Sequence, residues 1–341
     1  MAQCLVNRGV TSKAEVSEFL NPRIKLLADP FLIPNMDVAI ERLWKARENN
    51  ERLLIYGDYD VDGISSTALL TEMLTKLGWS VQPYLPGRFD DGYGLSAMAL
   101  ERCLEKFDID IVLAVDCGST AVEAIEYLNS RKVDALVLDH HQVSVPPPEP
   151  LAMVNPQLSN EYPNFQELCS VGLAFKLAHA LVKRGRQEGL QKERELDLKQ
   201  FLDLVALGTV ADLVPLTGEN RKLVRAGLEQ LGETTRPGLV ALKKVATVST
   251  PVTVFNVGFH LGPRLNAAGR MDNPGTSLDL LLAKDLYEAE KAAEMLDNYN
   301  QERRGIERDI STQAVERVRQ RFDPENDYVI VEGNMDWHLG V

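Results

Sequence analysis

The chain has 341 residues, 45% of them hydrophobic and 26% charged, and its 37 basic and 50 acidic side chains give a formal net charge of -13. This composition is typical of a globular protein, and the length favours two domains over one or three. So acidic a chain is unsuited to coating DNA regardless of sequence, because such binding depends on neutralising phosphates, although a nuclease with a local cationic cleft stays compatible with it.

Two further classes of protein do not fit the sequence. No apolar run approaches the roughly 18 residues that span a bilayer, and the segment after Met1 lacks the basic and apolar regions of a signal peptide. The four cysteines are scattered without CxxC spacing, which argues against a disulfide framework and against a thiolate zinc site. We therefore expect a cytoplasmic monomer with no membrane partner.

The first half of the chain predicts a sheet. Residues 1–50 are expected to form a helical lead-in, with helices at Lys13–Leu20 and Asn35–Asn49. The predicted strands that follow are Leu53–Tyr56, Val81–Leu85, Ile111–Val115, Ala135–Leu138 and Ala152–Val154, with helices between them at Ser65–Leu77, Ala97–Phe107 and Ala121–Ser130. This alternation is typical of an α/β protein with a doubly wound parallel sheet.

The second half is expected to be mostly helical. The predicted helices are Val171–Arg184, Asp197–Val210, Asn220–Leu231 and Gly238–Val245, and Thr247–Phe259 is expected to be irregular or β-rich. Leu286–Phe322 is nearly free of Gly and Pro and predicts one very long helix, or two joined near Gly305. Tyr328–Val331 then predicts the first strand of a second α/β domain.

Three aspartates alternate between the first predicted strand and the helix after it, at Asp58, Asp60 and Asp62. Carboxylates this close repel one another, and a divalent cation is the simplest means of holding them together in ionised form. An EF-hand loop fits worse, because its twelfth position would be Leu69 instead of Glu and because a strand precedes the motif. The placement predicts a metal site at the carboxyl end of a parallel sheet.

Further ligands follow other strands of the same sheet. Asp116 ends the strand Ile111–Val115, and Asp139, His140 and His141 end the strand Ala135–Leu138. Parallel strands open on one rim, so these side chains are expected to meet the three aspartates. Since successive residues of an extended segment point oppositely, we assign His140 to the metal and His141 to the substrate phosphate or to proton transfer.

A last carboxylate ends an almost wholly apolar predicted helix, at Asp212. A carboxylate is unfavourable at a helix C-terminus, so this position invites a cation. Oxygen-rich ligation with an imidazole and no thiolate suits Mn²⁺ or Mg²⁺ better than structural Zn²⁺. The number of carboxylates indicates two ions, which together could activate water and stabilise a phosphoryl centre. Cys117 beside Asp116 is interpreted as packing.

Two segments are candidates for substrate binding. Leu261–Arg270 supplies Arg264, Asn266 and Arg270, and arginine forks suit phosphate oxygens. Gly92–Ala97 formally matches G-x-G-x-x-A, yet it follows a polar stretch instead of a buried strand, so a dinucleotide site is disfavoured. A substrate loop that contains Tyr93, with Arg88 beside it, is the better hypothesis.

These motifs together resemble the DHH phosphoesterases, and within them the RecJ family of bacterial single-strand DNA exonucleases. The resemblance is carried by Tyr56–Gly63 (YGDYDVDG), Asp116–Ser119 (DCGS), Asp139–His141 (DHH), Gly208–Leu216 (GTVADLVPL) and Gly262–Met271 (GPRLNAAGRM). It implies that Asp62, Asp116, His140 and Asp212 surround one Mn²⁺, while Asp58, Asp60 and the shared Asp116 take the second. It further implies that His141 stands by the scissile phosphate, with Arg264, Arg270 and His338 on the substrate.

The resemblance also implies an organisation and an activity. Residues 51–285 would form the catalytic domain, 286–323 a connecting helix, and 324–341 the start of the DHH-associated (DHHA1) domain, cut off before its end and before an OB-like domain. The implied activity is metal-dependent 5′ to 3′ hydrolysis of single-stranded DNA to mononucleotides in recombination and repair. Single-strand-binding protein and a RecQ-type helicase are the implied partners.

Two alternatives stay open at this point. One is a family member that cleaves nano-RNA, cyclic dinucleotides or pyrophosphate, and the other is a truncated DNA-binding remnant with little or no activity.

Overall fold

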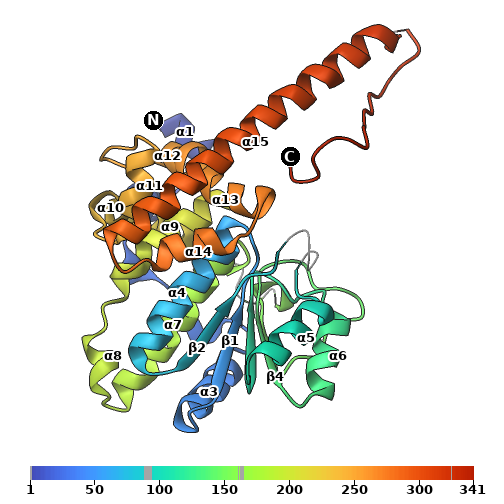
Figure 1. The fold of residues 1–341 in the computed structure, drawn as a ribbon. Helices are drawn as coiled ribbons and strands as arrows, with labels where there is room; N and C mark the ends of the chain where they lie inside the picture. Colours follow the sequence, from blue (N-terminus) through green and yellow to red (C-terminus); the bar gives the residue numbers. More distant parts are fainter. Residues whose placement is uncertain (1, 88–93, 160, 162–164, 324) are drawn as a thin grey trace.

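The computed structural model describes residues 2–87, 94–159, 161, 165–323 and 325–341. Its core is a five-stranded sheet in which every neighbouring pair is parallel, in the order β2-β1-β3-β4-β5 (Figure 1). The strands are β1 Arg52–Tyr56, β2 Ser80–Tyr84, β3 Ile111–Val115, β4 Asp134–Leu138 and β5 Ala152–Val154. The predicted strands and the doubly wound α/β class are confirmed. The strand order reverses between β1 and β3, which is where such sheets bind their ligands.

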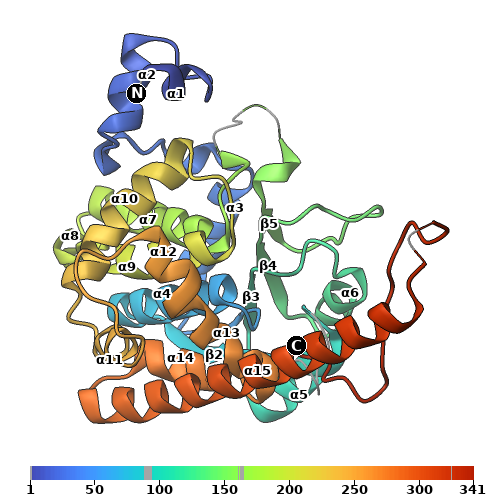
Figure 2. The same ribbon diagram turned by 90° about the horizontal axis from the view of Figure 1, so that it is seen from above.

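Helices cover both faces of this sheet. They are α1 Ala2–Val6, α2 Lys13–Leu20, α3 Met36–Glu48, α4 Val61–Leu77, α5 Ala97–Lys106, α6 Val122–Ser130, α7 Ser170–Gln187, α8 Gln191–Glu195, α9 Leu202–Ala211, α10 Gly218–Glu233, α11 Pro237–Val245, α12 Val254–Asn256, α13 Gly262–Met271, α14 Gly275–Leu282 and α15 Leu286–Arg321. Figure 2 shows α5 and α6 on one face and α3, α4 and α7 on the other, with α9–α14 stacked beyond them.

The two faces follow from the alternation of side chains along each strand. In β1, Leu53 and Ile55 belong to the large core shared with α3, α4 and α7, whereas Leu54 and Tyr56 belong to the smaller core under α5 and α6. The same alternation runs through β3 and β4. Strands buried on both faces place their carboxyl ends, and the polar loops that follow them, at a single edge.

Three predicted elements differ from the structure. Helix α4 begins at Val61 instead of Ser65, because the Asp60 side chain caps it by accepting from the backbone N–H groups of Asp62 and Gly63. Thr247–Phe259 is irregular as expected only in its first part, since α12 and the π-helix η6, Val257–Leu261, occupy its second part. Tyr328–Val331 is not a strand: these residues are irregular and exposed, and no described strand lies beside them to complete a ladder.

The long helix is a single element. Helix α15 runs unbroken from Leu286 to Arg321 through Gly305 and extends away from the body of the protein (Figure 1). Its first half packs on α11, α13 and α14. None of the described helices has the length and apolar character needed to cross a membrane.

An ion pair in the core ties the N-terminal lead-in to the helical layer. Lys176 of α7 is fully buried and pairs with Glu219, which is 3% exposed. Lys176 and Glu219 both bind the backbone of Ala28. The Lys176 ammonium donates to the Ala28 carbonyl at 3.0 Å, and the Ala28 N–H donates to the Glu219 carboxylate at 2.6 Å. Burial lowers the pKa of Lys176, and Glu219 opposes that shift.

We expect Lys176→Met to destabilise the fold by roughly 3–5 kcal/mol, because it leaves the Glu219 carboxylate buried without its counter-ion. Combining it with Glu219→Leu should cost less than the sum of the two single changes. Urea unfolding followed by circular dichroism would measure both, with the exposed pair Lys244 and Glu290 as the control. Strict additivity of the two single changes would contradict the account.

Candidate metal centre

The carboxylates predicted after β1 lie at the start of α4. Asp58 is 4% exposed, Asp60 is the N-cap, and Asp62 is buried in the first turn. The turn is tight: a Cβ on Gly63 would lie 2.5 Å from the Asp58 carbonyl oxygen, so only glycine fits there. The three side chains are therefore held close together by the backbone that joins β1 to α4.

Asp62 is fixed by a helix that begins far along the sequence. Its two carboxylate oxygens accept from the backbone N–H groups of Ser170 and Val171, at 2.7 and 2.8 Å, at the N-terminus of α7. A helix N-terminus favours a negative charge, so α7 orients this carboxylate and offsets part of its cost. From the other side, Gly208 of α9 leaves room for it, since a Cβ there would lie 2.9 Å from Asp62 Oδ1.

Asp116 and His140 complete the group from β3 and β4. The imidazole Nε2 of His140 lies 3.4 Å from Asp116 Oδ1, 3.7 Å from Asp212 Oδ2 and 4.0 Å from Asp62 Oδ2. Asp116 has a left-handed backbone, with φ 64°, a conformation that costs energy for a residue with a side chain and is concentrated at functional sites. Asp58, Asp60 and Asp116 form an adjoining group whose ligand atoms lie within 4.8 Å of one another.

Several of these polar atoms are buried without a hydrogen bond. Among the described residues, no partner is found for Asp58 Oδ1, Asp116 Oδ1, His140 Nε2 or Asp212 Oδ2. Buried polar atoms in folded proteins almost always have partners, and those that lack one mark an ion or a functional role. The atoms of Asp116 and Asp212 lie within 3.7 Å of His140 Nε2, and Asp58 belongs to the adjoining group that shares Asp116. Oxygen atoms with one imidazole nitrogen fit a hard divalent cation.

The electrostatics indicate the same need for a cation. Burial, followed by the neighbouring carboxylates, raises the pKa of Asp62 and Asp116 well above the ordinary value. Burial and the charge of Asp60 raise the pKa of Asp58 to about 7 and that of Asp212 to about 6. Burial also lowers the pKa of His140 to about 4, so the ring is neutral and its lone pair is available to a metal.

His141 points to a different partner from that of His140, as the alternation predicted. Its Nδ1 lies 2.8 Å from Asp139 Oδ1, and this hydrogen bond, working against burial, raises the pKa of His141 to about 9. Burial opposes ionisation of Asp139, but the bonds from His141 and Ser119 outweigh it and lower the pKa of Asp139 to about 2. Half of the His141 side chain is exposed, so the protonated imidazolium is accessible from solvent.

Two supporting residues, Asn155 and Cys169, were not identified from the sequence, and Asp139, which was expected at this edge, has a supporting role that the sequence did not assign. Asp139, whose place directly before the histidine pair was the available signal, accepts from the backbone of both histidines as well as from the His141 ring. Asn155, after β5, donates to the Ser119 hydroxyl and to the His141 carbonyl. Cys169 brings a buried thiol near Asp62 and Asp212, and burial raises its pKa. No spacing in the sequence indicates the last two.

The predicted substrate residues are only partly brought together. Arg264 is bound to Asp297 of α15 at 2.8 Å, and Asn266 accepts from the backbone of Val61, so both hold α13 in place. These contacts involve Arg264 Nε and Nη1 and Asn266 Oδ1, and the prediction that both side chains contact substrate stays a prediction. Arg270 and His338 do lie together, because Gly340 packs on the Arg270 backbone and beside the His338 ring. Arg88 and Tyr93 lie outside the described residues.

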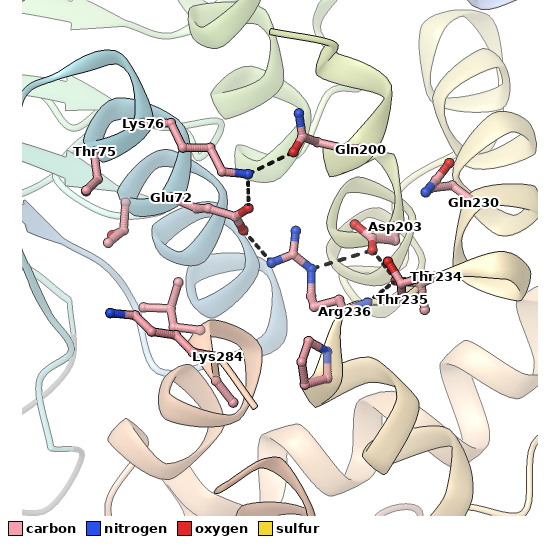
Figure 3. A pocket seen from close by; sticks show the side chains of 14 residues that line it. Glu72, Thr75, Lys76, Gln200, Asp203, Gln230, Thr234, Thr235, Arg236 and Lys284 are labelled. Atoms are coloured by element: carbon pink, nitrogen blue, oxygen red, sulfur yellow. Dashed lines mark hydrogen bonds and ion pairs between the residues drawn. The ribbon is translucent and has the colours of Figure 1, made fainter. Parts of the chain in front are cut away.

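A second polar hollow lies at the other end of α4, away from the carboxylates. It has a volume of about 680 Å³ and is lined by Glu72, Lys76, Asp203 and Arg236, among others (Figure 3). Lys76 bonds Glu72 at 2.7 Å and Gln200 at 2.8 Å, while Arg236 pairs with Glu72 and lies 3.5 Å from Asp203. These charges neutralise one another, so the network joins α4 to α9 and α11 and does not compete with the carboxylates as a metal site.

Known proteins share this architecture. The model of the DHH family, N-terminal domain, matches residues 52–209. The single-stranded-DNA-specific exonuclease RecJ of Bacillus subtilis is 36% identical over all of this chain and 42% of its own length, and that of Haemophilus influenzae is 37% identical over 94% and 57%. A crystal structure of exonuclease RecJ bound to manganese matches with 32% identity and a TM-score of 0.77, covering 90% of this chain and 75% of that one.

The chain belongs to the RecJ family of DHH proteins. The resemblance inferred from the motifs is thereby confirmed. RecJ from Thermus thermophilus in complex with Mn²⁺ matches with 30% identity and a TM-score of 0.80 over 98% of this chain and 46% of that one. The chain spans 42% to 59% of the lengths of the RecJ proteins from B. subtilis, H. influenzae and Escherichia coli.

We expect Asp139→Asn to lower the pKa of His141 from about 9 towards that of an ordinary imidazole, because it removes the hydrogen-bonded charge. A raised histidine pKa contributes stability that is present below the unfolded value and is lost as pH rises through about 9. NMR titration of the His141 ring would measure the shift, and Asp108→Asn, an exposed carboxylate, is the control. An unchanged titration would contradict the assigned pair.

Proposed function

We propose that this chain is the catalytic part of a metal-dependent exonuclease that hydrolyses single-stranded DNA. The single observation that carries the proposal is the gathering of Asp116, His140 and Asp212, with Asp58 in the adjoining group, at the switch point of the sheet, each with a buried ligand atom that has no hydrogen bond among the described residues. The named relatives support the substrate, since several are single-stranded-DNA-specific exonucleases. They favour DNA over the nano-RNA and cyclic dinucleotide alternatives.

Two divalent ions are assigned to the site, with Mn²⁺ favoured over Mg²⁺. RecJ structures with Mn²⁺ and with Mg²⁺ both support the metal class. Asp62, Asp116, His140 and Asp212 would hold one ion, and Asp58, Asp60 and Asp116 the other. The carboxylates crowd closely enough for Asp116 to serve both groups, because its oxygen atoms lie beside His140 on one side and in the Asp58 group on the other.

The bound ions would supply an activated water and stabilise charge on the attacked phosphoryl group. The residues of the chain would do the rest. His141, protonated and half exposed, would donate to a phosphate oxygen or to the leaving oxygen, with Asp139 holding its ring. Arg270 and His338 would contact neighbouring phosphates of the single-stranded DNA. The proposal includes release of mononucleotides in the 5′ to 3′ direction and a role in recombination and repair. It also includes two partners, single-strand-binding protein and a RecQ-type helicase.

We expect Asp116→Asn to remove both Mn²⁺ binding and hydrolysis of a 5′-labelled single strand. Asp116 is the proposed ligand of both ions, so the change removes a negative charge from both ligand groups. The loss in rate should be at least about 100-fold. Isothermal titration with Mn²⁺ and gel assays with and without EDTA would measure the two effects. Asp108→Asn, which alters an exposed carboxylate, is the matched control. Full turnover by Asp116→Asn would refute the bridging role.

We expect Mn²⁺ to raise the thermal midpoint more at about pH 8 than at about pH 5.5. The pKa values of Asp58 and Asp212 are raised to about 7 and about 6, so without a metal the folded protein is more stable when these two carboxyl groups are protonated. Their contribution to stability is present at low pH and is lost as pH rises through those values, where a cation compensates the bare charges. Differential scanning calorimetry would test this, and an equal shift at both values would count against it.

A further inference from the structure

A pair of stacked phenylalanines stands exposed on the segment that leads into α13. The rings of Phe255 and Phe259 have centroids 4.8 Å apart and planes inclined by 26°, yet the two residues are 59% and 70% exposed. Val254, also exposed at 41%, adjoins them. Large apolar side chains scattered singly on a surface need no explanation, but aligned neighbours form a patch of the kind that marks an interaction site.

The backbone that carries this pair is unusual. Phe259 lies in the π-helix Val257–Leu261, which joins α12 to α13 without a break. Single π turns inside helices are rare and occur frequently at functional sites. The segment is also held firmly, because Arg264 donates from Nη1 to the His260 carbonyl at 2.7 Å and from Nε to Asp297 at 2.8 Å. Arg264 thus fixes the helical segment on which Phe259 stands.

The segment that carries the pair packs against an element of the carboxylate centre. Helix α12 leads through η6 into α13, and η6 packs on α9, whose C-cap is Asp212. A Cβ on Gly262 would lie 3.6 Å from the Cβ of Ala211, the residue before Asp212. At its other end, α13 meets the first metal loop, where a Cβ on Gly269 would lie 3.0 Å from the Tyr59 carbonyl oxygen. The phenylalanines therefore stand on an extension of the helix that borders both loops.

We propose that Phe255 and Phe259 form a stacking platform for an unpaired base of the strand whose phosphodiester reaches the carboxylates. The inference rests on the proposed function. Every nucleobase has a π-face, so an aromatic platform holds a single strand without regard to sequence. A protein partner would be served as well by aliphatic side chains, whereas two stacked aromatic rings on a segment that packs against α9 match a base.

The test compares a thymidine strand with an abasic strand of equal length, by fluorescence anisotropy with Ca²⁺ in place of Mn²⁺. Base stacking is worth ~1–3 kcal/mol, so the wild type should bind the thymidine strand roughly 5- to 150-fold more tightly than the abasic one. The double variant Phe255→Leu/Phe259→Leu keeps the apolar volume without the rings, and should abolish most of that difference. Phe259→Trp should preserve it.

The matched control is Tyr287→Leu, which removes an exposed aromatic ring, 81% open, at the start of α15. It should leave both affinities unchanged. The inference is overturned if the double variant weakens both strands equally, if it weakens neither, or if the wild type binds neither strand. Hydrolysis with Mn²⁺ is measured separately. Hydrolysis without a difference in affinity between the thymidine and abasic strands would contradict the stacking platform alone. That difference in affinity without hydrolysis would contradict only the proposed function.

Discussion

The structure depends on the repulsion among carboxylates that the fold forces together at one edge of the sheet. Asp62 and Asp116 are almost fully buried and Asp58 nearly so, and each has a raised pKa because burial and like charges oppose its ionisation. Such an arrangement is unfavourable without a cation and strongly favourable with one. The surrounding architecture can be understood as the means of holding these groups in place against their mutual repulsion.

Three features of the fold hold the group together. The parallel sheet brings the loops after β1, β3 and β4 to one edge, and its strand order reverses beside Asp116. Two backbone N–H groups at the N-terminus of α7 donate hydrogen bonds to Asp62. They fix both carboxylate oxygens, and the helix N-terminus stabilises the negative charge. Asp139 holds the histidine segment by three hydrogen bonds, so that His140 faces inward and His141 outward. The opposite pKa shifts of the two histidines follow from these orientations.

The sequence predicted the sheet and the members of the centre because both depend on local patterns. Apolar runs of strand length alternate with helical periodicity, and the polar residues that end these runs must share an edge. Local patterns could not predict contacts between segments that are distant in the sequence. The N–H groups of Ser170 and Val171 reach Asp62 across more than 100 residues, and Arg264 is bound by Asp297 of α15. Only the packing of helices fixes those pairs.

The errors have physical reasons too. Tyr328–Val331 has the composition of a strand, but β-propensity measures how well a side chain fits a pleated neighbour, and these residues have none among the described strands. Thr247–Phe259 was expected to be irregular or β-rich, and only its first part is irregular, because the Thr253 cap begins a helical segment within it. The π-helix that follows could not be predicted, because no simple periodicity marks a π turn.

The most direct test of the central claim is anomalous diffraction at the manganese edge from crystals soaked in Mn²⁺. The account predicts two peaks, one among Asp62, Asp116, His140 and Asp212, and one between Asp58 and Asp116. Peaks confined to other parts of the surface, or no peak among these carboxylates at saturating Mn²⁺, would contradict it.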